Sequence, residues 1–221
     1  MLGMRFLRTV TKLAIAAVLL QAPVLPQSSD SAVGIFESRT NVGTATLPGS
    51  VEYDAVKSEY RVTGGGANLW GKVDGFHFLW KRVSGDFTMT ANIRVLPGSS
   101  SESHVHRKGA VMVRQELTQG SVYADAAVHG DGSTALQFRL VADEITAEIK
   151  PEVTAPAKVR IERRGNRFTM SYAVKVGDAL VTSAPQVVEM RDPVYVGVAV
   201  SAHKTDARET VVFSNLSFEQ R

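Results

Sequence analysis

Alternation of apolar and polar residues with a period of two is the feature that most constrains the fold of this chain. In residues 86–95, DFTMTANIRV, Phe87, Met89 and Ala91 alternate with threonine and asparagine. Successive side chains of a β-strand point to opposite faces of the sheet, so this pattern predicts half-buried strands. Similar runs recur between glycine-rich turns, and almost no stretch shows a helical period. The chain is therefore predicted to be all-β, an antiparallel two-sheet sandwich.

The N-terminal residues have the pattern of a secretory signal peptide. Arg5, Arg8 and Lys12 precede an apolar run from Leu13 to Leu20, and small polar residues follow. We expect residues 1–26 to be the signal peptide, 27–33 a linker and 34–221 a single domain. The apolar run is shorter than the roughly 20 residues of a spanning helix, so no stable transmembrane segment is expected after processing. The predicted location is secreted or periplasmic, and the absence of cysteine excludes disulfides.

The charge balance argues against nucleic acid as a partner. The formal net charge is +3, from 25 basic and 22 acidic side chains. Three of the basic residues lie in the predicted signal peptide, which leaves 22 basic residues against 22 acidic ones. Nucleic-acid binding normally requires a basic face on the folded domain, and a neutral domain does not predict one.

Residues 123–139, YADAAVHGDGSTALQFR, are predicted to form a β-hairpin with a glycine-rich turn. The expected register places Asp125 opposite Arg139, with a loop from Gly130 to Thr134 and a structural salt bridge between the two charged residues. One face of this hairpin is polar and carries Tyr123, Asp125, His129, Gln137 and Arg139. The other face is apolar and is predicted to pack between the sheets, with Val122, Ala124, Ala126, Val128, Leu136, Phe138 and Leu140.

The polar face of the hairpin is the predicted binding site. Arg114 and His203 have the parity to join it from neighbouring strands, and buried charges must be paired, solvated or bound to a ligand. Planar donors beside an aromatic ring suit a sugar or another polyhydroxylated ligand. The predicted ligand-binding residues are Trp70, His77, Arg114, His129, Gln137, Arg139 and His203. A polar loop, 97–109, is predicted to form the rim with His104, His106, Arg107 and Lys108.

Several segments of residues 34–218 resemble a bacterial family of unknown function with the concanavalin A-like lectin and glucanase jelly-roll fold. The matching pieces are GGGANLW, DGFHFLWKRVSGDF, HRKGAVMVR, HGDGSTALQFR, VRIERRGNRFTM and VYVGVAVSAH, before a closing FSNLSF. The resemblance implies a jelly roll. Similar domains occur beside Tol-type β-propellers and at the C-termini of β-xylosidases, which implies exported, carbohydrate-associated work.

The chain departs from the catalytic relatives of that fold. Retaining glucanases need two carboxylates roughly 5–5.5 Å apart, supplied by acidic residues at alternate strand positions. Asp143, Glu144 and Glu148 do not have that spacing, and Glu52 with Asp54 is only a pair. We therefore assign no catalytic residue and favour a non-catalytic protein, with an enzyme kept as the alternative.

Two short motifs have metal-binding interpretations. His104-X-His106 has a spacing that can hold a transition metal on a strand, but no carboxylate or cysteine lies beside it, and we interpret it as a solvated loop. His129-Gly-Asp-Gly could form a Ca²⁺ corner, but a plain turn explains the same residues. No metal ligand or cofactor is assigned from the sequence.

The sequence is compatible with three functions. The first is an exported, non-catalytic module that binds a glycan or small polar ligand. The second is a hydrolase or lyase on modified sugars, with His129 as general base and Arg114 or Arg139 stabilising negative charge. The third is a module that docks envelope proteins through the same face.

Overall fold

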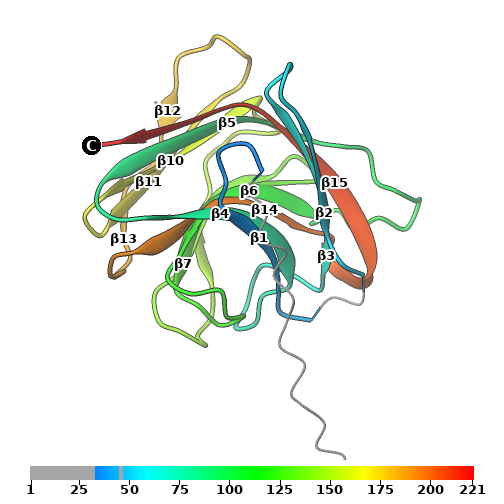
Figure 1. The fold of residues 1–221 in the computed structure, drawn as a ribbon, viewed down its shortest axis with the longest axis horizontal. Helices are drawn as coiled ribbons and strands as arrows, with labels where there is room; N and C mark the ends of the chain where they lie inside the picture. The colour runs from blue at the N-terminus through cyan, green and yellow to red at the C-terminus, as the bar shows by residue number, and fades with distance from the viewer. Residues whose placement is uncertain (1–32, 45–46) are drawn as a thin grey trace, which may run out of the picture.

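The computed structural model describes residues 33–44 and 47–221, and every regular element in this part of the chain is a β-strand. Figure 1 shows two sheets packed face to face in a jelly-roll sandwich. This arrangement confirms the predicted fold class. The predicted signal peptide, 1–26, and most of the linker lie outside the described residues.

The first sheet has seven antiparallel strands in the order β1-β4-β14-β6-β7-β8-β9. Their bounds are β1 Ser38–Val42, β4 Phe76–Val83, β14 Val194–Ser201, β6 Lys108–Arg114, β7 Tyr123–His129, β8 Thr134–Arg139 and β9 Ala147–Ile149. The second sheet follows the order β12-β11-β10-β5-β15-β3-β2, with β13 also paired to β11. Its bounds are β12 Val181–Thr182, β11 Arg167–Ala173, β10 Lys158–Arg164, β5 Phe87–Val95, β15 Lys204–Gln220, β3 Glu59–Gly66, β2 Ser50–Asp54 and β13 Gln186–Val187.

The main hydrophobic core fills the space between the two sheets. It contains the residues that the alternation in β5 placed inward, including Phe87, Met89 and Ala91. The apolar face of the β7–β8 hairpin packs against them from the opposite sheet, as predicted. Leu140 is the exception, because β8 ends at Arg139 and the leucine side chain is 49% exposed.

The register of the β7–β8 hairpin differs from the prediction. Tyr123 pairs with Arg139 and Asp125 pairs with Gln137, a shift of two residues from the expected pairing of Asp125 with Arg139. A shift of two keeps every side chain on its predicted face, because the strand period is also two. The predicted Asp125–Arg139 salt bridge is therefore wrong, and Arg139 finds its carboxylate partner in Asp74.

The outer face of the seven-stranded sheet carries a second, smaller hydrophobic cluster. Phe76, Phe78, Met112 and Tyr123 belong to it, together with Leu69 from the β3–β4 loop. This loop, residues 67–75, folds back over the sheet and buries its central part. A pocket lined by Asn68 and Trp70 of this loop opens on the outer face beside the covered area.

Candidate functional site

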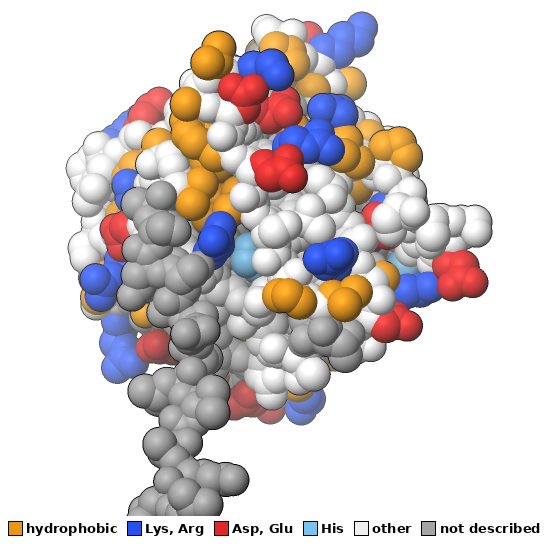
Figure 2. Space-filling model, turned by 45° about the vertical axis from the view of Figure 1, so that its right-hand side comes forward, with side chains coloured by type: hydrophobic (Ala, Val, Ile, Leu, Met, Phe, Trp, Pro, Cys, Tyr) orange, Lys and Arg blue, Asp and Glu red, His pale blue; other side chains and the backbone are white. Residues whose placement is uncertain are grey.

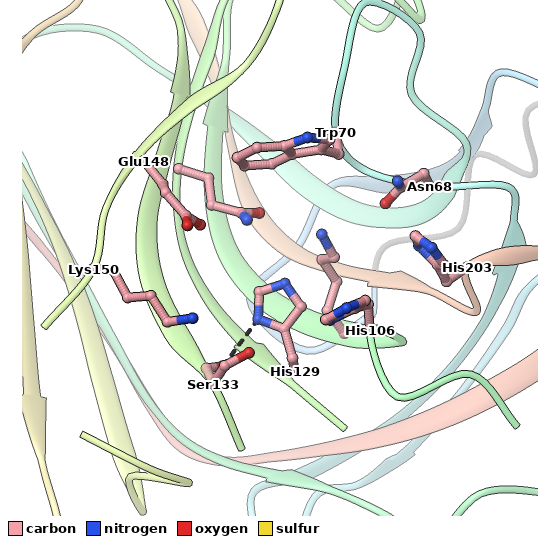
Figure 3. A pocket seen from close by; sticks show the side chains of 10 residues that line it. Asn68, Trp70, His106, His129, Ser133, Glu148, Lys150 and His203 are labelled. Atoms are coloured by element: carbon pink, nitrogen blue, oxygen red, sulfur yellow. Dashed lines mark hydrogen bonds between the residues drawn. The ribbon is translucent and has the colours of Figure 1, made fainter. Parts of the chain in front are cut away.

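A pocket of about 210 Å³ lies at the edge of the loop-covered area on the outer face of the seven-stranded sheet. Figure 3 shows side chains from several elements converging on it, with the indole of Trp70 across its top. The pocket is smaller than the ~300–1,000 Å³ of sites that enclose drug-sized ligands, so it suits a small unit such as one sugar ring. Its lining residues are Asn68, Trp70, His106, Lys108, His129, Ser133, Gln137, Glu148, Lys150 and His203.

Lys108 supplies a buried amine to the pocket. It begins β6, pairs with His129 across the β6–β7 ladder, and is only 3% exposed. Its Nζ donates to the carbonyl of Leu69 at 3.1 Å and lies 6.0 Å from the centroid of the Trp70 ring. Burial lowers the pKa of Lys108 to about 8, although the nearby Asp125 carboxyl opposes that shift. An ammonium group has three N–H donors, so this side chain can donate further to a ligand.

His129 presents a free ring nitrogen at the end of β7. Its Nδ1 lies 2.9 Å from the carbonyl oxygen of Ser133, which can only accept, so Nδ1 carries the proton. The neutral ring therefore keeps an unshared pair on Nε2, which can accept a proton or a hydrogen bond. Burial, with the nearby Lys108 charge as the next cause, lowers the pKa of His129 to about 4.

Gln137 and Asp125 leave buried acceptors unused beside the pocket. They pair directly across β7 and β8, and both are at most 1% exposed. Gln137 Oε1 and both carboxyl oxygens of Asp125 have no hydrogen-bond partner in the protein. Burial raises the pKa of Asp125 well above its usual range. Because an unsatisfied buried acceptor is costly, the unpaired Oε1 of Gln137, which lines the pocket, favours a molecule that donates a hydrogen bond.

The rim loop, residues 97–107, is tied down by a buried carboxylate of β15. Glu209 is 3% exposed and accepts from Ser99 N at 3.2 Å and from Ser103 Oγ at 2.5 Å. Arg107 Nε lies 3.7 Å from the same carboxylate, so its side chain fixes the loop and does not line the pocket. His104 stacks on His203 with ring centroids 3.9 Å apart, and is likewise not a lining residue.

Arg114 and Arg139 lie outside the pocket, in a fully buried ion cluster. Both bind Asp74, which ends the loop from 67 to 75: Arg114 Nη1 at 3.0 Å and Arg139 Nη2 at 2.7 Å. Arg139 also donates to the carbonyl of Gly71 at 3.0 Å. Both guanidinium groups therefore have a carboxylate partner within the protein. The two arginines do not need a ligand to compensate their buried charge. They instead hold the loop that carries Trp70.

His77 lies on the opposite side of the sheet from the pocket. In β4 it alternates with Phe76 and Phe78, which face the outer cluster, so its ring points toward the inter-sheet side. Its Nδ1 is 2.7 Å from Asn41 Oδ1, and the residue is 2% exposed. This parity separates His77 from the other predicted ligand-binding residues.

The structure thus gathers six of the predicted residues at one pocket: Trp70, His106, Lys108, His129, Gln137 and His203. The other four lining residues, Asn68, Ser133, Glu148 and Lys150, were not predicted from the sequence. Glu148 lies in β9 and Lys150 directly follows it, and β9 pairs Glu148 with Gln137. The alternation over three residues is too short to identify such a strand. Asp74 was also missed, because its role depends on two distant arginines.

No protein-family model matches the chain, and no curated protein matches it in sequence. Among solved structures, a functionally unknown protein from Saccharomyces cerevisiae superposes with a TM-score of 0.61 at 16% identity, over 83% of this chain and 96% of that one. A GH43 protein, BlXynB from Bacillus licheniformis, superposes with a TM-score of 0.51 at 8% identity, over 80% of this chain and 38% of that one. At these identities the similarity shows the fold alone.

One face of the molecule is of mixed charge. On the face drawn in Figure 2, acidic and basic side chains are interspersed, and histidine reaches the surface between them. The described residues contain no helix of membrane-spanning length and apolarity.

Proposed function

We propose that this protein is an exported binding module that takes one unit of a glycan, or a similar polyhydroxylated ligand, in the pocket beneath Trp70. We also propose that residues 1–26 are an export signal and that residues 34–221 form one domain. The family proposed for the chain is the one found beside Tol-type β-propellers. The observation that carries the binding function is the set of unused hydrogen-bonding groups beside an aromatic face.

The donors and acceptors in the pocket match a diol. Lys108 has N–H groups to spare, while Gln137 Oε1 and His129 Nε2 can accept. Each hydroxyl of a sugar both accepts and donates, so two adjacent hydroxyls can serve all three groups. The flat apolar side of a sugar ring can then pack on the indole of Trp70, because this residue is only partly buried.

Tryptophan fluorescence gives a direct test, because the chain has only two tryptophans. Trp80 is remote from the pocket: its ring packs on Tyr195 and its Nε1 donates to Thr40 Oγ1. In a Trp80→Phe background, Trp70 is the single reporter. We expect saturable changes in its emission on titration with a panel of xylo-, manno- and cello-oligosaccharides and uronic acids.

The variant Gln137→Leu should weaken the binding of the best sugar about tenfold, because it removes the buried acceptor and nearly preserves volume. Arg82→Ala, at an exposed position outside the pocket, is the matched control and should bind normally. If no sugar binds more tightly than about 1 mM, the proposal fails.

A second candidate, sugar hydrolysis or elimination, is favoured by the orientation of His129. The Ser133 carbonyl leaves Nε2 free to take a proton, with the Lys108 amine beside it to stabilise negative charge. In this mechanism Lys108 stabilises the negative charge, a role that the sequence had suggested for Arg114 or Arg139. Glu148 is the only carboxylate among the described residues that line the pocket, which does not suit a two-carboxylate glucanase. A panel of glycosides and uronides, assayed with wild type and His129→Ala, distinguishes this activity from binding alone.

A further inference from the structure

An open groove adjoins the pocket beneath Trp70. Its volume is about 630 Å³, and Ser133 and Lys150 line both the groove and the pocket. Figure 3 shows these two side chains on one side of the pocket, with Asn68 and His203 on the other. The groove therefore continues the pocket past Ser133 and Lys150. Its lining residues are Asp131, Ser133, Lys150, Pro151, Glu152, Val153 and Thr154.

The two walls of the groove are joined by backbone contacts. One wall is the β7–β8 turn, and the other is the segment that follows β9. Ser133 and Thr154 form an isolated β-bridge between them, and the N–H of Ala155 donates to the carbonyl of Gly132 at 2.8 Å. The carboxylate of Asp131 fixes the turn, because its Oδ1 accepts from Ser133 N at 2.9 Å and from Ser133 Oγ at 2.7 Å. The protein therefore holds the groove in shape through its own contacts.

The close approach of the two walls depends on unusual backbone conformations. Gly132 has a φ of +83°, and a Cβ at this position would lie 2.6 Å from Thr154 Cγ2. Ala155 has a φ of 46°, a left-handed conformation that residues with a Cβ rarely adopt. Strained residues of this kind persist where the surrounding structure holds them, and they cluster at ligand-binding sites. The Gly-Asp-Gly turn therefore does more than reverse the chain, since it positions the far wall of the groove.

The side chains along the groove leave hydrogen-bonding groups free for a ligand. Lys150, Glu152 and Thr154 form no side-chain hydrogen bond or ion pair with any other residue in the described part of the chain. An ammonium group donates, a carboxylate accepts and a hydroxyl does both. Pro151 and Val153 add apolar surface that is partly buried. This combination suits a sugar unit, because a sugar ring has hydroxyls at its edge and apolar C–H groups on its faces.

We propose that the groove is a second glycan subsite, so that the protein binds an oligosaccharide of at least two units and not a single sugar. This inference rests on the function proposed above, which places the first unit beneath Trp70. The next unit lies in the groove, where Lys150 donates to its hydroxyls and Glu152 accepts from them. Two linked units bind more tightly than one, because the second unit binds in an effectively intramolecular step.

Calorimetry with sugars of increasing length tests the second subsite. The probes are xylose, mannose and glucose, each with its β-1,4-linked disaccharide and trisaccharide. In the series that binds best, we expect the disaccharide to bind about tenfold more tightly than the monosaccharide. The trisaccharide should gain less than about threefold over the disaccharide, because its third unit extends beyond the two subsites.

A variant confined to the groove separates the two subsites. Glu152→Ala combined with Thr154→Val removes a carboxylate and a hydroxyl, and neither residue lines the pocket beneath Trp70. We expect the disaccharide to bind about tenfold more weakly and the monosaccharide to bind as in wild type. Both residues are exposed, so the variant should retain the fold, which circular dichroism checks. Glu52→Ala, in β2 of the other sheet, is the matched control and should bind both sugars normally.

Equal affinities of wild type for the monosaccharide and the disaccharide would overturn the second subsite and leave the proposed function standing. Unchanged disaccharide binding in the groove variant would also overturn it, as would a loss that is equal for both sugars or equally large in Glu52→Ala. A disaccharide that binds when its monosaccharide is too weak to measure supports the subsite, provided that the groove variant weakens that binding. If none of these sugars binds, the proposed function fails and the second subsite fails with it.

Discussion

Asp74 and Arg139 form a two-point ion pair across 65 residues of sequence, with Oδ1 to Nη2 and Oδ2 to Nη1 distances both of 2.7 Å. Both side chains are fully buried, and Arg114 Nη1 approaches the same carboxylate at 3.0 Å. The pair fixes the β3–β4 loop against β8. Because this loop carries Asn68 and Trp70, a charge cluster outside the pocket determines the shape of the pocket.

Removing the Asp74 carboxylate should destabilise the protein strongly. Asp74→Ala leaves two buried guanidinium groups without a counter-charge, and losing one partner of a buried pair typically costs about 3–5 kcal/mol. Urea denaturation should show this loss in the free energy of unfolding. Glu52→Ala, which removes an exposed pair with Arg61, should leave the midpoint nearly unchanged. Equal effects of the two variants would contradict the structural role of Asp74.

Loss of Glu209 should loosen the rim loop. Glu209→Ala removes the acceptor for Ser99 and Ser103 and leaves Arg107 without its carboxylate. We expect faster amide hydrogen exchange in residues 97–107, with little change in the strands of the distant β10–β11 hairpin. Glu209→Gln keeps an acceptor without the charge and should give an intermediate rate. Unchanged protection of the loop in Glu209→Ala would show that other contacts hold it.

His77 should make the protein less stable in mild acid. Burial, assisted by the nearby Arg39 charge, lowers the pKa of His77 to about 4 from a usual 6.5. Between these pH values the unfolded chain binds more protons than the folded one, so the free energy of unfolding falls as the pH falls from 6.5 towards 4. Across this whole range, the lowered pKa of this residue, which is 2% exposed, reduces the free energy of unfolding by about 3 kcal/mol.

The measurement for His77 is chemical denaturation at several pH values. His77→Gln should be less sensitive to pH than wild type across this window, although His129 and His203 have pKa values lowered in the same direction and will preserve part of the slope. Identical pH profiles for His77→Gln and wild type would show that this histidine does not titrate as described.

Gly197 should not tolerate a side chain. A Cβ at this position in β14 would lie 1.9 Å from the carbonyl oxygen of Leu79, in the paired strand β4. Since backbone cannot move aside in the middle of a sheet, Gly197→Ala should lose about 3 kcal/mol or fail to fold. Gly85→Ala is the control: its Cβ meets open space, and only its φ of +80° costs about 1 kcal/mol. Thermal denaturation of Gly197→Ala and Gly85→Ala measures the loss of stability in each variant.

The fold class, and the sets of side chains that share a face, follow from the order of residues along the chain. Alternation in β5 identified Phe87, Met89 and Ala91 as core, and parity put His129, Gln137 and Arg139 together on the other face of the hairpin. This information is local, because adjacent side chains of an extended chain must point in opposite directions.

Which residues on that face can contact a ligand depends on contacts between distant segments of the chain. Parity cannot distinguish registers that differ by two, so the partner of Asp125 was misassigned and Asp74 was not found. Arg139 and Gln137 share a face, yet a loop from elsewhere in the chain buries the arginine and leaves the glutamine at the pocket. The same packing brings His203 from β14–β15 to His106, since contacts between distant segments depend on how loops fill space above the sheet.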